Sequence, residues 1–219
     1  MAERIVACAG WLLAGGEGRR VGGQDKGLLP WRGRPMGDHV LAAMAPQVGG
    51  LGIVANRHAD RYRALLTHHA SGTAHPVAEP PAPTSLGVHA DDPGLPPFSG
   101  PLAGMLTAMT ATPQEWIWFL PCDMPRLPGD VLATLWRAAH RDGADVAVPC
   151  TPDGLDGSRH HWVCALMHKR VLPTLQTAFI SGERKVGHLI ARCKWTSVSF
   201  ADAAGFANFN TLETEHGGD

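Results

Sequence analysis

The sequence predicts an α/β protein: a three-layer α/β/α sandwich around a mainly parallel, Rossmann-like sheet. The first observation is that short apolar runs of strand length alternate along the chain with segments whose apolar side chains recur at helical spacing. The second is the run Trp-Ile-Trp-Phe-Leu at residues 116–120, which shows no polar alternation. Such a run is typical of a central parallel strand that helices cover on both faces.

Each element follows from a local pattern. The apolar runs that predict strands lie at residues 11–13, 52–55, 86–89, 116–120, 146–148, 162–167 and 196–200. The segments that predict helices lie at residues 35–47, 59–66, 101–110, 128–140, 169–179 and 186–192. Pro35 and Pro101 open two of these helices, because the first helical position tolerates a residue without an N–H. Residues 68–99 are rich in proline and turn-forming residues, so a long loop insertion is expected there. The length of 219 residues fits one domain over the whole chain, 1–219.

Composition narrows the class of function. The formal net charge of −1 supplies no overall positive field that would attract nucleic acid. No apolar run approaches the roughly 18 residues of a membrane-spanning helix, and the N-terminal residues lack a signal-peptide pattern. The five cysteines are widely spaced without a C-x-x-C pair, which favours reduced thiols, and the twelve histidines show no metal-ligand spacing. We therefore expect a cytoplasmic protein that binds neither nucleic acid nor a membrane.

A glycine-rich basic loop follows the first expected strand. Six of the fifteen residues at 13–27 are glycine, and Arg19, Arg20 and Lys26 lie among them. Glycines allow main-chain N–H groups to approach an anion closely, and successive N–H groups form anion-binding concavities. The spacing excludes a P-loop, because Gly27 stands where Ser or Thr is required, and it excludes the dinucleotide fingerprint, because Val21 replaces the third glycine. The loop is therefore expected to bind phosphates in another way.

A single carboxylate ends the central apolar strand. Asp123 lies between Pro121 and Pro125, which stiffen the chain on both sides. In sheets of this kind, ligands bind outside the carboxyl ends of the strands, where both Asp123 and the glycine-rich loop fall. Mg²⁺ usually takes one or two carboxylates together with substrate phosphate oxygens. Asp123 is therefore the expected ligand of a Mg²⁺ cofactor.

Five ordered segments carry a family resemblance. They are Leu-Ala-Gly-Gly-x-Gly-x-Arg-x-Gly-Gly-x-Asp-Lys-Gly-Leu at 13–28, Gly-Pro-Leu-Ala-Gly at 100–104, Pro-Cys-Asp-Met-Pro at 121–125, Gly-Glu-Arg-Lys-Val at 182–186 and Phe-Ala-Asn-Phe-Asn-Thr-Leu-Glu at 206–213. Together they resemble the signature of the molybdenum cofactor guanylyltransferases. The resemblance implies a single nucleotidyltransferase domain. It also implies that the terminal phosphate of molybdopterin attacks the α-phosphorus of Mg-GTP, so that pyrophosphate leaves and the guanine dinucleotide form of the cofactor is made.

The resemblance also implies roles for individual residues. Arg19, Lys26 and Asp123 are the expected catalytic residues. The expected nucleotide-binding residues are Leu13, Ala14, Gly15, Gly16, Gly22, Lys26, Asn56, Asp91, Asp92 and Asp123. The expected molybdopterin-binding residues are Arg184, Lys185, Asn208 and Asn210.

Two of these assignments stay open on the sequence. The family places one aspartate at the end of the third strand, and Asp91 and Asp92 fit it equally well. A family asparagine falls at Val54 in this sequence, so Asn56 is a candidate only because it lies on the same strand face two residues later.

Related activities remain as alternatives. A cytidylyltransferase acting on the same cofactor and a sugar-phosphate nucleotidyltransferase would use a similar site. A non-catalytic protein that binds GTP or delivers the cofactor is a different class of function, but it would not need a metal carboxylate beside the phosphates. The expected partners of the enzyme are GTP, molybdopterin and the proteins that deliver or insert the cofactor into a molybdoenzyme.

Overall fold

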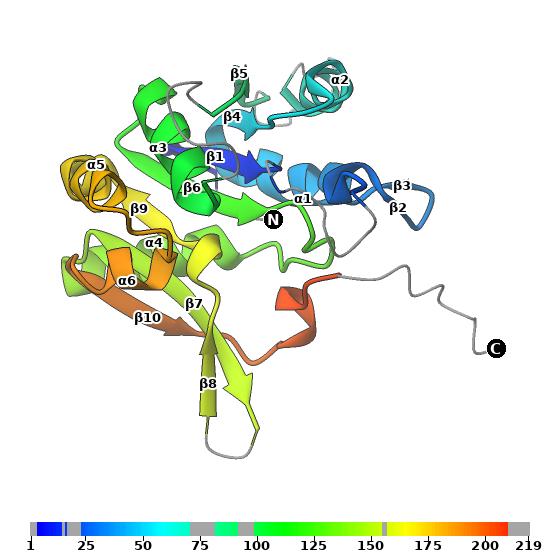
Figure 1. Ribbon diagram of the computed structural model, residues 1–219. Helices are drawn as coiled ribbons and strands as arrows, with labels where there is room; N and C mark the ends of the chain where they lie inside the picture. Colours follow the sequence, from blue (N-terminus) through cyan, green and yellow to red (C-terminus); the bar gives the residue numbers. More distant parts are fainter. Residues whose placement is uncertain are drawn as a thin grey trace.

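The computed structural model describes residues 4–14, 16, 23–70, 82–91, 99–154 and 157–209. Eight strands form the main sheet, in the order β10-β7-β9-β6-β1-β4-β5, with β8 paired to β7 (Figure 1). Their bounds are β1 Ile5–Leu13, β4 Val48–Val54, β5 Thr84–His89, β6 Trp116–Pro121, β7 Val146–Asp153, β8 Gly157–His160, β9 Leu166–His168 and β10 Trp195–Ser199. The pairs β1·β4, β1·β6, β4·β5 and β7·β10 are parallel, whereas β9 and β8 run antiparallel to their neighbours. The mainly parallel sheet expected from the sequence is therefore confirmed.

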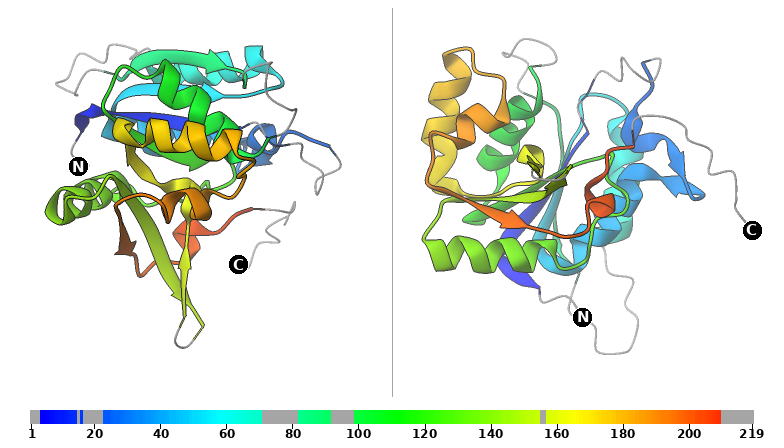
Figure 2. Two further views of the ribbon diagram at one scale, coloured as in Figure 1. Left: turned by 60° about the vertical axis from the view of Figure 1, so that its left-hand side comes forward. Right: turned by 90° about the horizontal axis from the view of Figure 1, so that it is seen from below.

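Helices cover both faces of this sheet. One layer contains α1 (Met36–Met44), α2 (Ala59–Ala70) and α4 (Val131–Asp142), and the other contains α3 (Pro101–Ala111), α5 (Leu172–Ile180) and α6 (Val186–Ile190). The sheet lies between the two layers in the right-hand view of Figure 2. The three-layer sandwich is confirmed as well, and no helix of the described residues is long and apolar enough to cross a membrane.

The two faces of the central strands explain the layers. On β1, Cys8 and Leu12 pack into the core beneath α1, α2 and α4, whereas Ala9 and Trp11 pack into the core beneath α3, α5 and α6. All four side chains are fully buried. Alternate residues of a strand face opposite sides, so a continuous apolar run supplies both cores at once.

Three expectations differ from the structure. The strand expected at 162–167 begins only at Leu166, because Trp162–Cys164 form a 3-10 turn. The helix expected from Pro128 begins at Val131. Within the region expected as a loop at 68–99, α2 continues to Ala70, whereas the strand expected at 86–89 is confirmed as part of β5 (Thr84–His89). Residues 71–81 and 92–98 lie outside the described chain.

A small hairpin lies outside the main sheet, and none of the five cysteines forms a disulfide bond. Strands β2 (Pro30–Trp31) and β3 (Arg34–Pro35) form a separate two-stranded sheet that precedes α1. Every cysteine is free, and Cys8, Cys122, Cys150 and Cys164 are buried.

Candidate active site

Four parallel strands end at the same level of the sheet. The register pairs Leu13 of β1 with Val54 of β4 and with Pro121 of β6, and it pairs Val54 with His89 of β5. Main-chain hydrogen bonds continue past the strand ends, since Ala14 N donates to Val54 O over 2.8 Å. The segments that follow these strands therefore meet at one edge, which is where ligands of such sheets bind.

Lys26 and Asp123 meet at this edge. Lys26 belongs to a short 3-10 turn (Lys26–Leu28), and its Nζ lies 3.5 Å from Oδ2 of Asp123. Asp123 is only 8% exposed, and its other oxygen, Oδ1, is buried with no hydrogen-bond partner in the part of the chain that the structure describes. Burial raises the pKa of Asp123, although the Lys26 charge opposes that rise. The structure thus brings together two residues that the sequence placed 97 positions apart, in an arrangement suited to phosphate and metal.

The buried Asp123 carboxylate fits the Mg²⁺ that the sequence leads us to expect. An unpartnered buried carboxylate oxygen is unfavourable unless a cation or a donor satisfies it. No cluster of three or more His, Cys, Asp or Glu side chains that could hold a metal occurs among the described residues. Magnesium does not need such a cluster, because one carboxylate and substrate phosphate oxygens suffice. Asp123 is thus able to act as the protein ligand.

Asn56 and Asp91 form a reciprocal pair at the ends of β4 and β5. The Asn56 side-chain Nδ2 donates to Asp91 Oδ2 over 2.7 Å, and Asp91 N donates to Asn56 Oδ1 over 2.8 Å. Asp91 Oδ1 is buried and accepts no hydrogen bond from another described residue. Asn56 therefore holds Asp91 beyond the end of β5, while Asp92 lies outside the described residues.

A buried tyrosine fixes the segment that carries Lys26. Tyr62, on α2, is fully buried, and its hydroxyl donates to Asp25 Oδ1 over 2.6 Å. Burial raises the pKa of Tyr62 above its ordinary value, so the hydroxyl keeps its proton. No sequence pattern indicates this contact, although Tyr62 is the chain's only tyrosine and follows the expected strand end by seven residues.

Gly27 is packed against that tyrosine. A Cβ atom built at Gly27 would lie 2.4 Å from the Tyr62 hydroxyl oxygen and 3.0 Å from Cys122 Cβ. We expect Gly27→Ala to lower the free energy of unfolding by about 1–3 kcal/mol, because both neighbours are buried and must shift. Urea denaturation measures the change. Gly23→Ala is the comparison for an added methyl group in the same segment: nothing lies within 4 Å of its Cβ, so any loss there reflects its positive φ alone. Equal stability of Gly27→Ala and wild type would contradict the packing.

The last described segment of the chain is joined to Asp123. Phe209 N donates to the main-chain oxygen of Asp123 over 2.9 Å. The Phe209 ring lies 5.7 Å from the Trp31 ring, and the Arg126 guanidinium lies 5.2 Å from the Phe209 centroid. These contacts bring Asn208, an expected molybdopterin-binding residue, beside the strand-end edge, where it is exposed.

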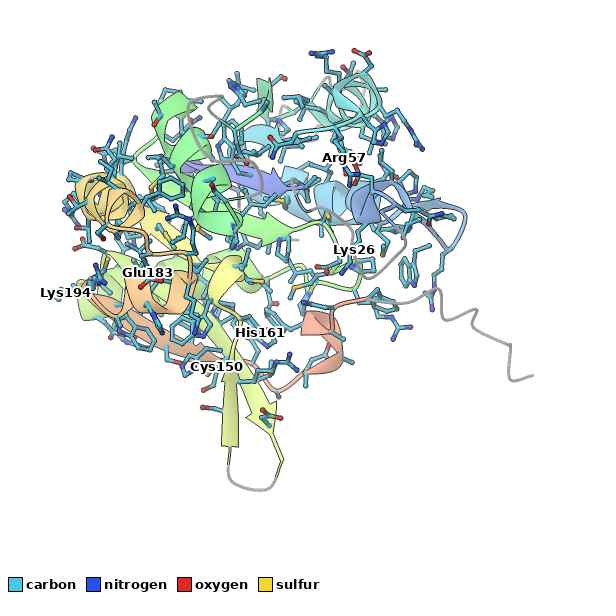
Figure 3. The ribbon with its side chains drawn as sticks, viewed as in Figure 1. Lys26, Arg57, Cys150, His161, Glu183 and Lys194 are labelled. Atoms are coloured by element: carbon cyan, nitrogen blue, oxygen red, sulfur yellow. The ribbon has the colours of Figure 1, made fainter. Side chains whose placement is uncertain are left out.

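The structure does not bring Arg184 and Lys185 to Asp123. The Arg184 Nη1 donates to the carbonyls of Phe179 and Glu183, and its guanidinium lies 4.2 Å from the Phe179 ring centroid. Lys185 is exposed and precedes α6. Figure 3 shows Glu183 on one side of the molecule and Lys26 on the other.

The chain matches a known protein family over most of its length. The MobA-like NTP transferase domain matches residues 10–197. The chain belongs to this family. A protein of Cupriavidus necator called molybdenum cofactor guanylyltransferase is 40% identical over 205 residues, which cover 93% of this chain and 92% of that protein. A protein of the same description from Photobacterium profundum is 34% identical over 203 residues, which cover 92% of this chain and 90% of that one.

Solved structures of the MobA-like and neighbouring nucleotidyltransferase groups share the fold. Molybdopterin-guanine dinucleotide biosynthesis protein A of Archaeoglobus fulgidus superposes with a TM-score of 0.65 at 20% identity, covering 93% of both chains. A 4-diphosphocytidyl-2C-methyl-D-erythritol synthase of Anaerococcus prevotii superposes with a TM-score of 0.69 at 10% identity, covering 94% of this chain and 93% of that one. The family resemblance and the transferase class predicted from the sequence are therefore confirmed.

Several residues with expected roles lie outside the described part of this family member. They are Gly15, Arg19, Gly22, Asp92 and Asn210. Leu13, Ala14 and Gly16 are described, and all three lie at or just beyond the end of β1. The roles of these residues stay predictions.

Proposed function

We propose that this chain transfers GMP from GTP to the terminal phosphate of molybdopterin, with Mg²⁺ as cofactor. A phosphate oxygen of molybdopterin forms a bond to the α-phosphorus of GTP, the bond from that phosphorus to the bridging oxygen breaks, and pyrophosphate leaves with the electron pair. The printed names of the curated relatives support the choice of nucleotide and acceptor. The observation that supports this chemistry is the ion pair between Lys26 and Asp123, at the edge of the sheet where β1 and β6 end.

The residues of the chain perform three tasks in this reaction. Main-chain groups of Leu13 and Ala14 hold the nucleotide at the end of β1. The Lys26 ammonium neutralises charge that develops on the phosphate oxygens, which is the main requirement of nucleotidyl transfer. Asp123 would hold Mg²⁺, which would supply Lewis-acid stabilisation of the phosphate charge. This carboxylate is only 8% exposed, so water competes little for it.

Pyrophosphate release tests the proposal directly. Purified protein with Mg²⁺, GTP and molybdopterin is expected to release pyrophosphate and form the guanine dinucleotide product, and chelation of Mg²⁺ with EDTA is expected to stop the reaction. Faster release with CTP would favour a cytidylyltransferase, and a sugar phosphate that outcompetes molybdopterin would favour a sugar-phosphate nucleotidyltransferase. Tight GTP binding without pyrophosphate release would favour a cofactor-delivery protein. The product is expected to pass to proteins that insert the cofactor into a molybdoenzyme.

The Asn56–Asp91 pair yields a prediction about nucleotide affinity. Asn56→Leu removes both hydrogen bonds that hold Asp91, so we expect KM for GTP to rise about tenfold while kcat changes less, because a ground-state contact is lost. Steady-state kinetics at varied GTP measures both constants. Asn56→Asp is the matched comparison: its two acceptor oxygens repel Asp91, and the KM increase should be at least as large. An unchanged KM in both variants would remove Asp91 from the nucleotide site.

A further inference from the structure

Arg57 spans the glycine-rich loop. It follows Asn56 at the carboxyl end of β4, and its guanidinium makes two hydrogen bonds to main-chain carbonyls. The Nη1 atom donates to Gly23 O over 2.9 Å, and the Nη2 atom donates to Gly16 O over 3.1 Å. Gly16 and Gly23 are seven positions apart in the sequence, on either side of Arg19 and Arg20. Arg57 and Lys26 lie in the same region of Figure 3.

The geometry suits arginine and no other side chain. A guanidinium presents its N–H donors as a rigid planar fork, so it can hold two carbonyls at a fixed separation. A lysine ammonium carries the same charge on a flexible stem and lacks this fork. Both acceptors are carbonyls rather than carboxylates, so the positive charge of Arg57 is not neutralised by these contacts. That charge remains beside the segment expected to bind phosphates.

The segment after β4 holds the loop at a second point. Tyr62 N donates to His58 O at the start of α2, and the Tyr62 hydroxyl donates to Asp25, the residue before Lys26. Burial is the main cause of the raised pKa of Tyr62, so its hydroxyl keeps the proton that it donates to Asp25. Arg57 and Tyr62 therefore connect α2 and its preceding turn to both Gly23 and Asp25.

We infer that Arg57 is a positioning residue for nucleotide binding: its guanidinium holds the carbonyls of Gly16 and Gly23 at a fixed separation. The inference rests on the proposed function for the identity of the nucleotide. A main chain that is held at two fixed points before the ligand arrives loses less conformational entropy on binding, which increases affinity. Arg57 thus acts through the loop rather than on the reacting atoms.

Two measurements on the full chain test this role. Hydrogen exchange, read by mass spectrometry on peptides covering residues 13–27 of the unliganded protein, reports the order of the loop. Isothermal titration with Mg-GTP reports affinity. The variants are Arg57→Ala, which removes charge and fork, and Arg57→Lys, which keeps the charge and removes the fork. Arg63→Ala is the matched control. Arg63 is an exposed arginine on α2, six residues after Arg57, and it pairs with Asp60.

Both Arg57 variants are expected to exchange faster in the loop peptides and to bind GTP about tenfold more weakly, which is the effect of losing one strong hydrogen-bond pair. Arg63→Ala should match wild type in both measurements, and the melting temperature of all variants should stay near that of wild type. Wild-type exchange in Arg57→Ala, or wild-type exchange and affinity in Arg57→Lys, would overturn the inference. Failure of the wild-type protein to bind GTP would instead count against the proposed function, and the exchange measurement would still decide the role of Arg57.

Discussion

Lys26→Ala is expected to lower kcat for pyrophosphate release by about 10²–10³-fold, the usual effect of removing one charged group that stabilises a transition state. Lys26 Nζ lies 3.5 Å from Asp123 at the strand-end edge, so its loss removes positive charge where the triphosphate is expected to bind. The variant should still fold, because the Lys26 side chain is part-exposed and contributes little to the apolar core. Steady-state pyrophosphate release measures kcat, and circular dichroism checks the fold.

Lys194→Ala is the matched control for Lys26→Ala. Lys194 is an exposed lysine before β10, on the opposite side of the molecule in Figure 3. Lys194→Ala removes one positive charge, as Lys26→Ala does, so any general effect of net charge appears in both variants. Near-normal turnover of Lys26→Ala, or an equal loss in both variants, would contradict the assigned role.

Asp123→Asn is expected to reduce activity at least as strongly, by about 10³-fold, while it makes the protein more stable. An amide has the shape of the carboxylate but is a poor ligand for Mg²⁺, so the stabilisation of phosphate charge by the metal, worth several kcal/mol, is lost. The stability gain, on the order of 1 kcal/mol, arises because a buried and incompletely paired charge is replaced by a neutral group. The measurements are pyrophosphate release at varied Mg²⁺ and urea denaturation.

The pH dependence of that stability gain has a definite sign. Because the pKa of Asp123 is raised in the folded protein, the native state holds its proton at pH values where the unfolded chain has lost it. The contribution of Asp123 to wild-type stability is therefore fully present below the unfolded pKa of about 3.9, and it is lost as pH rises through the folded pKa. Asp123→Asn lacks this loss, so the stability difference between variant and wild type should be small at low pH and grow as pH rises. A difference that shrinks with rising pH would show that Asp123 is stabilised as a carboxylate.

The order of strands and helices is predictable from the sequence because the side chains of each apolar run pack into a core on one or both sides of the sheet. The exceptions have local causes. Trp162 lies in an apolar run, yet it leaves the strand because its ring stacks on His160, with centroids 4.7 Å apart, and lies within contact distance of Gly187. Strand β8 (Gly157–His160) was not expected, since it has no apolar alternation and owes its conformation to pairing with β7.

The residues of the site are predictable only where the local sequence shows that they follow the end of a strand. Lys26 and Asp123 each follow a recognisable strand end, so their meeting could be expected from topology alone. The hydrogen bond that holds Asp91 joins it to Asn56 across 35 residues, and no local sequence pattern indicates such a contact. The role of Arg57 is hidden for the same reason, because its partners Gly16 and Gly23 belong to a different segment.

The contact between Gly27 and Tyr62 has an evolutionary consequence. The tyrosine hydroxyl occupies the space that a side chain at position 27 would need, and the same hydroxyl binds Asp25. The three positions therefore cannot change independently. Across diverging relatives we expect them to covary: a smaller residue at position 62 should be accompanied by a larger one at position 27 and by a replacement for the Asp25 carboxylate. Drift at a position buried under α2 would then reshape the segment that presents Lys26 to the nucleotide.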